Sequence, residues 1–372
     1  MRVLFTAPLR GDVTLPGGIS KNIREIATNL VKRGHECTVI SLNTMGLEPE
    51  ENLDGVRIIR INSPIGKHLY GLSFGIYRFL RSNGVNQIRP DVVHVHGFHS
   101  LLAAELIYVF KKMRLPIVFS PHYDVRSHDT LAGEYLWGLY RTIIGRRIFS
   151  IPDLIICASE FEAKMVEKDL HVSASKIKII PHGVDKITTK NKKKKDGMIS
   201  LLYVGHILEL KGIQHILPAL RELVYTYGCD AVLTIVGEGV YKKKLVSLAK
   251  ELRVADHITW KPFLPRSKLY KEYENADIFL LLSRSENYGI VVAEALACGT
   301  PCIVANTTAL KEFTKEPGCF GVDYPPDPKK LAELIIKIHE SDVQVGPFSR
   351  KIRTWDDVVG DYENLYYSLL RQ

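Results

Sequence analysis

The chain has 372 residues, of which 46% are hydrophobic, and a formal net charge of +9. This length allows two domains with separate cores, and because no apolar run reaches 18 residues we expect no membrane-spanning helix. Residues 190–195 hold five lysines, and without them the charge falls to +4. The excess positive charge is therefore mostly a local solvated tract, so we expect no nucleic-acid partner. The positive charge that remains fits an anionic substrate or an anionic membrane surface.

The first half of the chain alternates short apolar strands with helices. Strands are expected at residues 3–7, 37–42, 56–61, 91–97, 117–120, 154–158 and 176–180, and helices at 19–33, 137–149 and 160–170. The first strand, a loop ending in Gly17 and Gly18, a helix and a second strand form a βαβ unit. Such a unit belongs to a parallel sheet that binds ligands at its strand carboxyl ends. The two glycines lack the spacing of a dinucleotide site, and a tight turn explains them about as well.

Polar residues lie on or just after two of these strands. His94 and His96 point to the same face, because side chains alternate along a strand. His122 and Asp124 follow the strand at 117–120. Strand ends are where α/β proteins carry out chemistry, and a His-x-His pair with a later His and Asp also suits a metal-dependent hydrolase. The residues alone leave both interpretations open.

The ends of the chain and one aromatic segment bear on its location. Residues 2–7 read as a strand and are too short for a secretory signal, so we expect a cytoplasmic protein. Residues 64–80 are aromatic and basic, which fits either a lipid interface on the inner face of the cell membrane or a core helix.

The six cysteines are scattered and are expected to be small core residues. Cys298 and Cys302 are included, because Gly299 and Pro301 break the helical spacing that a pair of metal ligands would need.

The second half repeats the alternation after a basic linker. Strands are expected at 199–204, 231–236, 257–260, 278–282 and 302–305, and helices at 213–227, 241–252, 268–275, 290–297 and 328–339. The pattern predicts an α/β fold with two Rossmann-like doubly wound domains facing across a cleft. We expect an N-terminal domain at 1–187, the linker at 188–198, a C-terminal domain at 199–353, and a helix at 354–372 that packs back on the first domain.

The stretch from Ser283 to Pro301 has the pattern of a ligand-binding loop that leads into a helix. A buried strand precedes it, and a polar loop then gives way to an apolar helix at 290–297. The free N–H groups around Tyr288, Gly289 and Ile290 would point at a ligand above the strand end. The sequence therefore predicts a phosphate site at this helix N-terminus.

Two carboxylates frame that phosphate site. Glu286 lies in the loop and Glu294 lies in the helix. Each carboxylate can accept two hydrogen bonds from a vicinal diol, which suits sugar or ribose hydroxyls beside a diphosphate. Alternatively, Glu294 is an ordinary solvated helix residue and Glu286 favours the helix N-terminus electrostatically.

Across nearly its whole length the sequence resembles the retaining nucleotide-sugar glycosyltransferases of family 4. The motifs that carry the resemblance are Gly17-Gly18-Ile19, His94-x-His96-Gly97, His122 with Asp124, Ile180-Pro-His-Gly-Val-Asp185, Lys211-Gly212, Val236-Gly-Glu-Gly239 and Glu286-x7-Glu294. The resemblance implies the glycosyltransferase-B fold. It also implies transfer of a hexose-type sugar from a nucleotide diphosphate sugar to an acceptor hydroxyl, with retention and without a metal or other cofactor.

The resemblance also implies roles for individual residues. Glu294 would bind the ribose, Glu286 a hydroxyl of the transferred sugar, and Lys211 the departing diphosphate. Gly18 would let its loop approach the phosphates, and His122 would contact the sugar near the reacting carbon. The loop at 261–264, with Phe263 and Leu264, would hold the base.

Three positions depart from the family pattern. His206 stands where the family has an arginine, so the diphosphate clamp would depend more on Lys211. His182 replaces the usual asparagine, and the loop after Trp260 lacks the common glycine, which leaves the base open. The acceptor is expected to be a glycan or a lipid-linked molecule, and nothing in the sequence indicates an oligomeric state. Rival interpretations are the metal-dependent hydrolase, a nucleotide-sugar epimerase and a non-catalytic binding module.

Overall fold

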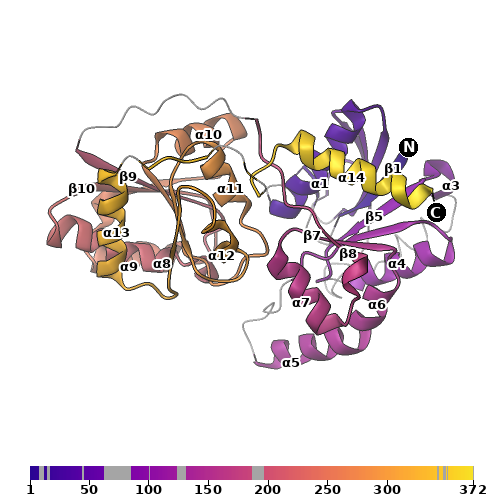
Figure 1. Cartoon of the computed structure of the whole chain (residues 1–372), viewed down its shortest axis with the longest axis horizontal. Coiled ribbons are helices and arrows are strands. Elements are labelled where there is room, and N and C mark those ends of the chain that lie inside the picture. Colours follow the sequence, from indigo (N-terminus) through magenta and orange to yellow (C-terminus); the bar gives the residue numbers. More distant parts are fainter. Residues whose placement is uncertain are drawn as a thin grey trace. The chain divides into compact units, whose positions relative to one another are not determined.

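The computed structural model describes residues 1–7, 12–14, 17–43, 46–62, 85–99, 101–123, 131–186, 197–341, 343–346, 349 and 351–371. The chain divides into two compact units, Met1–Gly183 with Trp355–Gln372, and Val184–Thr354. Each unit contains one mainly parallel sheet covered by helices (Figure 1). The predicted α/β class, with a Rossmann-like sheet in each half, is confirmed. The aromatic segment at 64–80 and the lysine run at 190–195 lie outside the described residues.

The first unit is an eight-stranded sheet. Its strands are β1 (Arg2–Thr6), β2 (Glu36–Leu42), β3 (Glu50–Leu53), β4 (Val56–Ile61), β5 (Val92–His96), β6 (Ile117–Ser120), β7 (Leu154–Cys157) and β8 (Ile177–Ile179). Their order is β3-β4-β2-β1-β5-β6-β7-β8, and only β3 is antiparallel to its neighbour. The central strands are fully buried, as the continuous apolar runs predicted.

The helices of the first unit include one formed by the end of the chain. They are α1 (Gly18–Lys32), α3 (Val85–Ile88), α4 (Leu101–Lys112), α5 (Leu131–Tyr140), α6 (Arg146–Ser150), α7 (Glu160–Leu170) and α14 (Trp355–Leu370). A π-helical turn, Arg141–Gly145, joins α5 to α6. Glu363 of α14 contacts Arg33 at 2.8 Å and His35 at 2.7 Å, at the end of α1. These contacts, together with the buried Tyr362 and Tyr366, attach α14 to the first unit.

The second unit is a six-stranded, wholly parallel sheet. Its strands are β9 (Met198–Val204), β10 (Asp230–Val236), β11 (Ile258–Lys261), β12 (Ile278–Leu281), β13 (Cys302–Ala305) and β14 (Cys319–Val322). Its helices are α8 (Ile213–Arg221), α9 (Lys242–Glu251), α10 (Arg266–Asn275), α11 (Ile290–Ala297), α12 (Leu310–Phe313) and α13 (Pro328–Glu340). The strand order, β11-β10-β9-β12-β13-β14, reverses direction between β9 and β12. Ligands of doubly wound sheets bind outside the carboxyl ends of the strands at such a reversal.

Several elements differ from their predicted extents. The helix expected at 137–149 begins earlier, at Leu131, because the preceding Leu-Ala-Gly-Glu-Tyr-Leu run contains good helix formers. The helix expected at 213–227 ends at Arg221 and continues as a π-helical turn, Glu222–Thr226. Five of the six cysteines are buried, as expected for core residues. In the part of the chain that the structure describes, no helix is long and apolar enough to cross a membrane.

Candidate active site

The loops that follow β9 and β12 are joined by backbone hydrogen bonds at the strand reversal of the second unit. The N–H of Arg284 donates to the Leu210 carbonyl at 2.8 Å, and the Ser283 hydroxyl donates to the same oxygen at 3.1 Å. Gly212, with φ of 74°, packs so closely that a Cβ there would lie 1.8 Å from the Leu282 carbonyl oxygen. Only glycine fits, and its position fixes the side chain before it, Lys211, next to the β12 loop.

Lys211 and Glu286, predicted from the sequence as catalytic residues, form an ion pair. The Lys211 ammonium lies 2.6 Å from Glu286 Oε1, and both side chains are largely buried. The main chain of Glu286 is held in turn by Thr308, whose hydroxyl accepts its N–H at 2.9 Å. No sequence pattern pointed to Thr308, which comes from the loop between β13 and α12. The pair combines a positioned cation with a carboxylate that can accept sugar hydroxyls.

His206, after β9, contacts the loop that follows β11. The His206 ring meets the Phe263 ring edge to face, with centroids 5.1 Å apart. Partial burial and the charge of Lys211 lower the pKa of the His206 imidazole. A neutral imidazole is a weaker phosphate partner than the arginine of the family pattern. Phe263 is exposed and Leu264 is half-buried, so the predicted base-binding loop is open to a ligand.

The anion site was predicted at the first turn of α11. Gly289 caps the helix with φ of 93°, a left-handed conformation that suits glycine, and α11 begins at Ile290. The Val292 N–H donates to the Gly289 carbonyl at 2.9 Å, whereas the N–H groups of Ile290 and Val291 have no acceptor in the helix backbone. Tyr288 turns its side chain inward, where its hydroxyl donates to the Lys351 carbonyl at 2.8 Å. Tyr288 therefore offers a ligand only its backbone.

Glu294 is not a solvated helix residue, because it is only 3% exposed. The hydroxyl of Tyr273, on α10, donates to Glu294 Oε2 at 2.9 Å. Tyr273 is itself fully buried, and the Thr300 hydroxyl donates to its carbonyl at 2.5 Å. The alternative of an ordinary surface acid is therefore wrong for Glu294. Sequence reasoning missed Tyr273, which lies in a helix without any motif, as the residue that orients this carboxylate.

We expect Tyr273→Phe to weaken donor binding without slowing the chemical step. Loss of one hydrogen bond to a charged group is worth roughly 1.5 kcal/mol, so the KM for the sugar nucleotide should rise about tenfold. The kcat should stay within about twofold, since Tyr273 contacts Glu294 and not the reacting atoms. Steady-state kinetics at varied donor concentration measure the split.

A matched control for this variant is Tyr227→Phe. Tyr227 also donates to a glutamate, Glu333, at 2.8 Å, but on the exposed surface near α13. The Tyr227→Phe variant should leave the KM for the sugar nucleotide unchanged. If Tyr273→Phe changed kcat instead of KM, Tyr273 would not act by orienting a ground-state contact.

In the first unit, His122 lies in a buried cluster of histidines at the carboxyl ends of β5 and β6. Its Nε2 is 3.1 Å from His96 Nδ1, and its ring centroid lies 6.1 Å from that of His182. His182 is hydrogen-bonded to Asn22 of α1 at 3.0 Å. His122 adopts φ of 49°, which is a strained backbone conformation for a residue other than glycine. Residues in such conformations cluster at functional sites. Asp124 lies outside the described residues.

In the predicted His-x-His pair, His94 is committed to internal hydrogen bonds, whereas His96 bonds His122 through Nδ1 and its buried Nε2 has no partner among the described residues. His94 and His96 lie on the same face, as predicted, with ring centroids 4.1 Å apart. Both nitrogens of His94 are used, one with Tyr366 at 2.7 Å and the other with Ser120 at 2.8 Å. Among the described residues no group of three or more His, Cys, Asp or Glu has metal-binding geometry. Because both ring nitrogens of His94 are hydrogen-bonded inside the fold, neither is left to bind a metal. This argues against the metal-dependent hydrolase.

Gly17 and Gly18 lie at the start of α1, after β1 and on the same sheet edge as His122. Gly17 precedes the helix and Gly18 is its first residue. Among the described residues, no atom would lie within 4 Å of a Cβ built on Gly18, which leaves space above it. This space and the free N–H groups of the first turn agree with the predicted close approach of a ligand.

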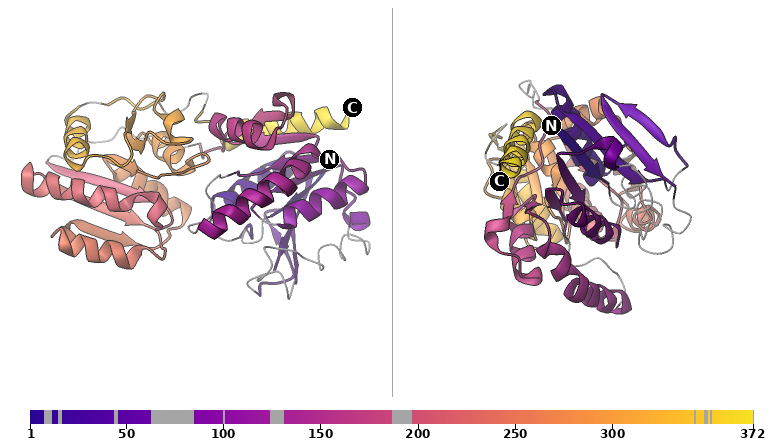
Figure 2. Two further views of the ribbon diagram at one scale, coloured as in Figure 1. Left: turned by 90° about the horizontal axis from the view of Figure 1, so that it is seen from below. Right: turned by 90° about the vertical axis from the view of Figure 1, so that its right-hand side faces the viewer.

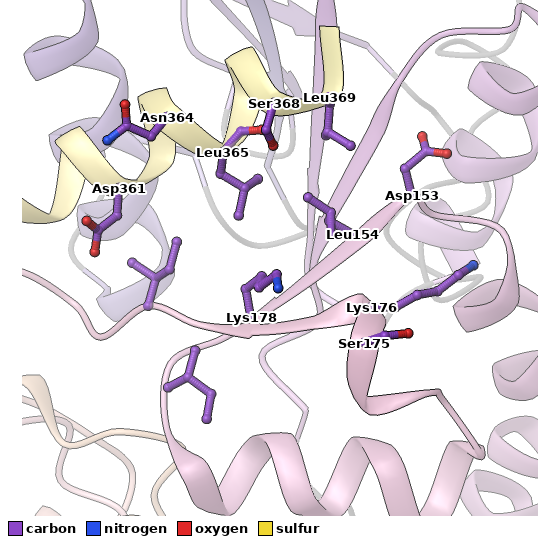
Figure 3. A pocket seen from close by; sticks show the side chains of 12 residues that line it. Asp153, Leu154, Ser175, Lys176, Lys178, Asp361, Asn364, Leu365, Ser368 and Leu369 are labelled. Carbon is purple, nitrogen blue, oxygen red and sulfur yellow. The ribbon is translucent and has the colours of Figure 1, made fainter. Parts of the chain in front are cut away.

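A groove of about 770 Å³ in the first unit contains none of the predicted site residues. It lies between α14 and the edge strand β8, as Figure 3 shows, and its lining includes Lys176, Lys178 and Asn364. The Lys176 ammonium already donates to the carbonyls of Ser150 and Pro152. The groove is thus a gap beside an edge strand, and its lining side chains do not form a ligand-binding site.

Comparisons with known proteins agree with this geometry. A family model described as "Glycosyl transferases group 1" matches residues 185–353, and one described as "Glycosyltransferase Family 4" matches residues 16–186. An uncharacterised glycosyltransferase of Methanocaldococcus jannaschii is 26% identical over 94% of each chain. Sucrose-phosphate synthase from Thermosynechococcus elongatus has a similar structure, with a TM-score of 0.83 and 17% identity over all of both chains. HepE of Anabaena, solved with UDP and glucose, has a TM-score of 0.70 and 15% identity over 100% of this chain and 98% of that chain.

Proposed function

Since the chain belongs to the group 1 glycosyltransferases of family 4 and is a glycosyltransferase, we propose that it moves a hexose-type sugar from a nucleotide diphosphate sugar to an acceptor hydroxyl with retention. The observation that carries the proposal is the Lys211–Glu286 pair at the strand reversal of the second sheet. A cation that can meet the diphosphate stands there beside a carboxylate that can meet the sugar. The acceptor we propose is a glycan or a lipid-linked molecule, with a peripheral contact at the inner face of the cell membrane.

The carboxylates and the lysine of the candidate site each receive a part in this reaction. Glu294, oriented by Tyr273, accepts hydrogen bonds from the ribose diol, and Glu286 accepts one from a sugar hydroxyl. Lys211 and the N–H groups at the start of α11 stabilise the charge that develops on the departing diphosphate. These groups supply positive charge themselves, so the proposed reaction requires no metal ion. The chelator EDTA should therefore leave turnover unchanged.

In the proposal, retention follows from departure of the diphosphate and attack of the acceptor on the same face of the sugar, without a covalent sugar–enzyme intermediate. Glu286 is bound to Lys211 and serves as a substrate ligand, not a nucleophile. The acceptor hydroxyl then attacks from the face that the diphosphate leaves, and a phosphate oxygen takes its proton. His122, buried and neutral because desolvation lowers its pKa well below the usual value, contacts the donor sugar through hydrogen bonds.

A thermal-shift panel of UDP-, GDP- and ADP-sugars tests the proposal and identifies the base. A ligand at one hundred times its Kd stabilises the native state by about 2.7 kcal/mol, which corresponds to a Tm increase of about 5 °C. We expect one base to give this increase. HepE, which has the same fold, is solved with UDP, so UDP-sugars are the first to try. Glu294→Ala should abolish the shift, whereas Glu333→Ala on the far helix α13 should not.

Turnover assays with the same sugar nucleotides separate the rival activities. Acceptor-dependent transfer with retained configuration, followed by NMR of the product, supports the proposal. A sugar nucleotide that is converted without an acceptor would favour an epimerase. Binding without any turnover would favour a non-catalytic module.

A further inference from the structure

The helix formed by α5, the π-helical turn and α6 exposes a row of large apolar side chains. Tyr135, Leu139 and Ile143 recur at every fourth residue, which places them on one face. Their exposed fractions are 74%, 47% and 55%. We call this face, together with Arg146 and Arg147, the α5–α6 stripe. Large apolar residues so exposed and so close together mark an interaction surface.

The opposite face of the same helix fixes the stripe in place. Trp137 is buried, with its ring 5.3 Å from Phe98 and 5.1 Å from His99. Further along, Phe149 is fully buried against Phe98. The helix is therefore anchored by its aromatic inner face. The outer face stands at the margin of the first unit, where α5 projects beyond α6 and α7 (Figure 1 and the right view of Figure 2).

Two arginines continue the stripe with uncompensated charge. Arg146 and Arg147 are exposed, and within the described ranges neither has an ion pair. By contrast Arg141, on another side of the helix, pairs with Asp169 at 3.3 Å. The stripe thus presents three apolar side chains beside two guanidinium groups that are free to bind phosphates.

We propose that the α5–α6 stripe is a docking surface for an anionic lipid bilayer. Projecting apolar side chains on a convex helix need a deformable apolar partner, and the acyl region below the headgroups provides one. The guanidinium groups meet lipid phosphates at the same time, while Tyr135 takes the interfacial position that tyrosine favours. The proposal deepens the proposed function, because it assigns its membrane contact to this helix.

Co-sedimentation with vesicles tests the proposal on the full chain. Vesicles of phosphatidylcholine with added phosphatidylglycerol should bind the protein at least about tenfold more tightly than phosphatidylcholine alone, and high salt should weaken this binding. Replacing two apolar residues in Leu139→Asp/Ile143→Asp should lower the affinity by about tenfold or more. Arg146→Glu/Arg147→Glu should lower it by at least about 25-fold, at about fivefold for each positive charge lost.

Matched controls lie elsewhere on the same unit. Leu370→Asp changes a leucine of similar exposure, 40%, at the end of α14. Lys164→Glu/Lys168→Glu reverses two exposed charges on α7. Both controls should bind vesicles as the parent protein does.

Two results would overturn the docking surface. One is vesicle binding that the stripe variants leave unchanged, and the other is no binding to anionic vesicles at all. If Leu139→Asp/Ile143→Asp instead abolished self-association in solution, the stripe would be an interface between copies of the chain. The stripe variants should keep the donor-induced thermal shift, and Lys211→Ala should keep vesicle binding while it loses transfer. The two proposals can therefore fail separately.

Discussion

Lys211→Ala is expected to lower the transfer rate at saturating donor by about 10²- to 10³-fold, the usual effect of removing one fixed group that stabilises developing charge. Lys211 is held at 2.6 Å from Glu286, and Gly212 fixes its main chain against Leu282. Its charge is thus in place before the donor bond breaks. Because the diphosphate gains charge mainly as it leaves, kcat should fall more than donor affinity. Acceptor-dependent release of nucleoside diphosphate measures kcat, and isothermal titration with the intact donor measures affinity.

Two further variants separate a lost charge from a damaged site. Lys211→Arg keeps a cation and should recover activity to within about tenfold of the parent protein. Lys337→Ala removes an exposed lysine from α13 and should have no effect. Transfer by Lys211→Ala within about fivefold of the parent rate would contradict the leaving-group role. An equal loss of affinity and rate would show that Lys211 binds the ground state as strongly as the transition state.

The fold was largely predictable because parallel strands are buried on both faces and appear as short apolar runs. The runs at β9, β10, β12 and β13 were each recognised from four or more consecutive apolar or β-branched residues. The edge strands were harder. β3 has the sequence Glu-Glu-Asn-Leu and pairs antiparallel with β4, and β14 contains Gly321, so neither carries the apolar signal. Helix α4 was also missed, although its apolar content matches a core helix.

The candidate site was predictable where its residues follow strand ends. Lys211, Glu286 and Gly289 lie in loops after β9 and β12, and the strand reversal brings the two loops together. The burial of Glu294 also had a signal in the sequence, because α11 is apolar around its whole circumference and such helices are buried. Tyr273 and Thr308 had none, since they reach the site only through long-range packing of α10 and the loop before α12.

The buried histidines of the first unit predict a loss of stability in mild acid. Burial lowers the pKa of His94 to about 3 and that of His182 to about 4. Burial and neighbouring histidines also lower the pKa values of His96 and His122 well below the usual value. All four are therefore neutral when folded, but they gain protons below about pH 6.5 when the chain unfolds. The unfolded state binds more protons, so the free energy of unfolding falls as the pH falls.

Glu162, in the same cluster, opposes part of this effect. Burial raises its pKa to about 7, although it accepts the N–H groups of Ala158 and Tyr123. The folded state therefore gains a proton as the pH falls below 7, which stabilises it relative to the unfolded chain. Each histidine loses on the order of 1–2 kcal/mol between pH 6.5 and pH 5, and Glu162 returns a similar amount. The cluster should destabilise the first unit by about 5 kcal/mol over this range, which is a large part of the stability of a domain.

Replacing one buried histidine should remove its contribution to the pH dependence of the unfolding free energy. His182→Asn keeps a side chain that can reach Asn22 but cannot be protonated. The difference in unfolding free energy between pH 6.5 and pH 5 should therefore shrink by about 1–2 kcal/mol in the variant. Urea unfolding, monitored by tryptophan fluorescence, measures this difference in unfolding free energy, because Trp137 and Trp355 are both buried in the first unit. His171→Asn, at an exposed position after α7, is the control. If the parent protein were as stable at pH 5 as at pH 6.5, or if both variants changed the difference equally, the four histidines would not be buried as neutral groups.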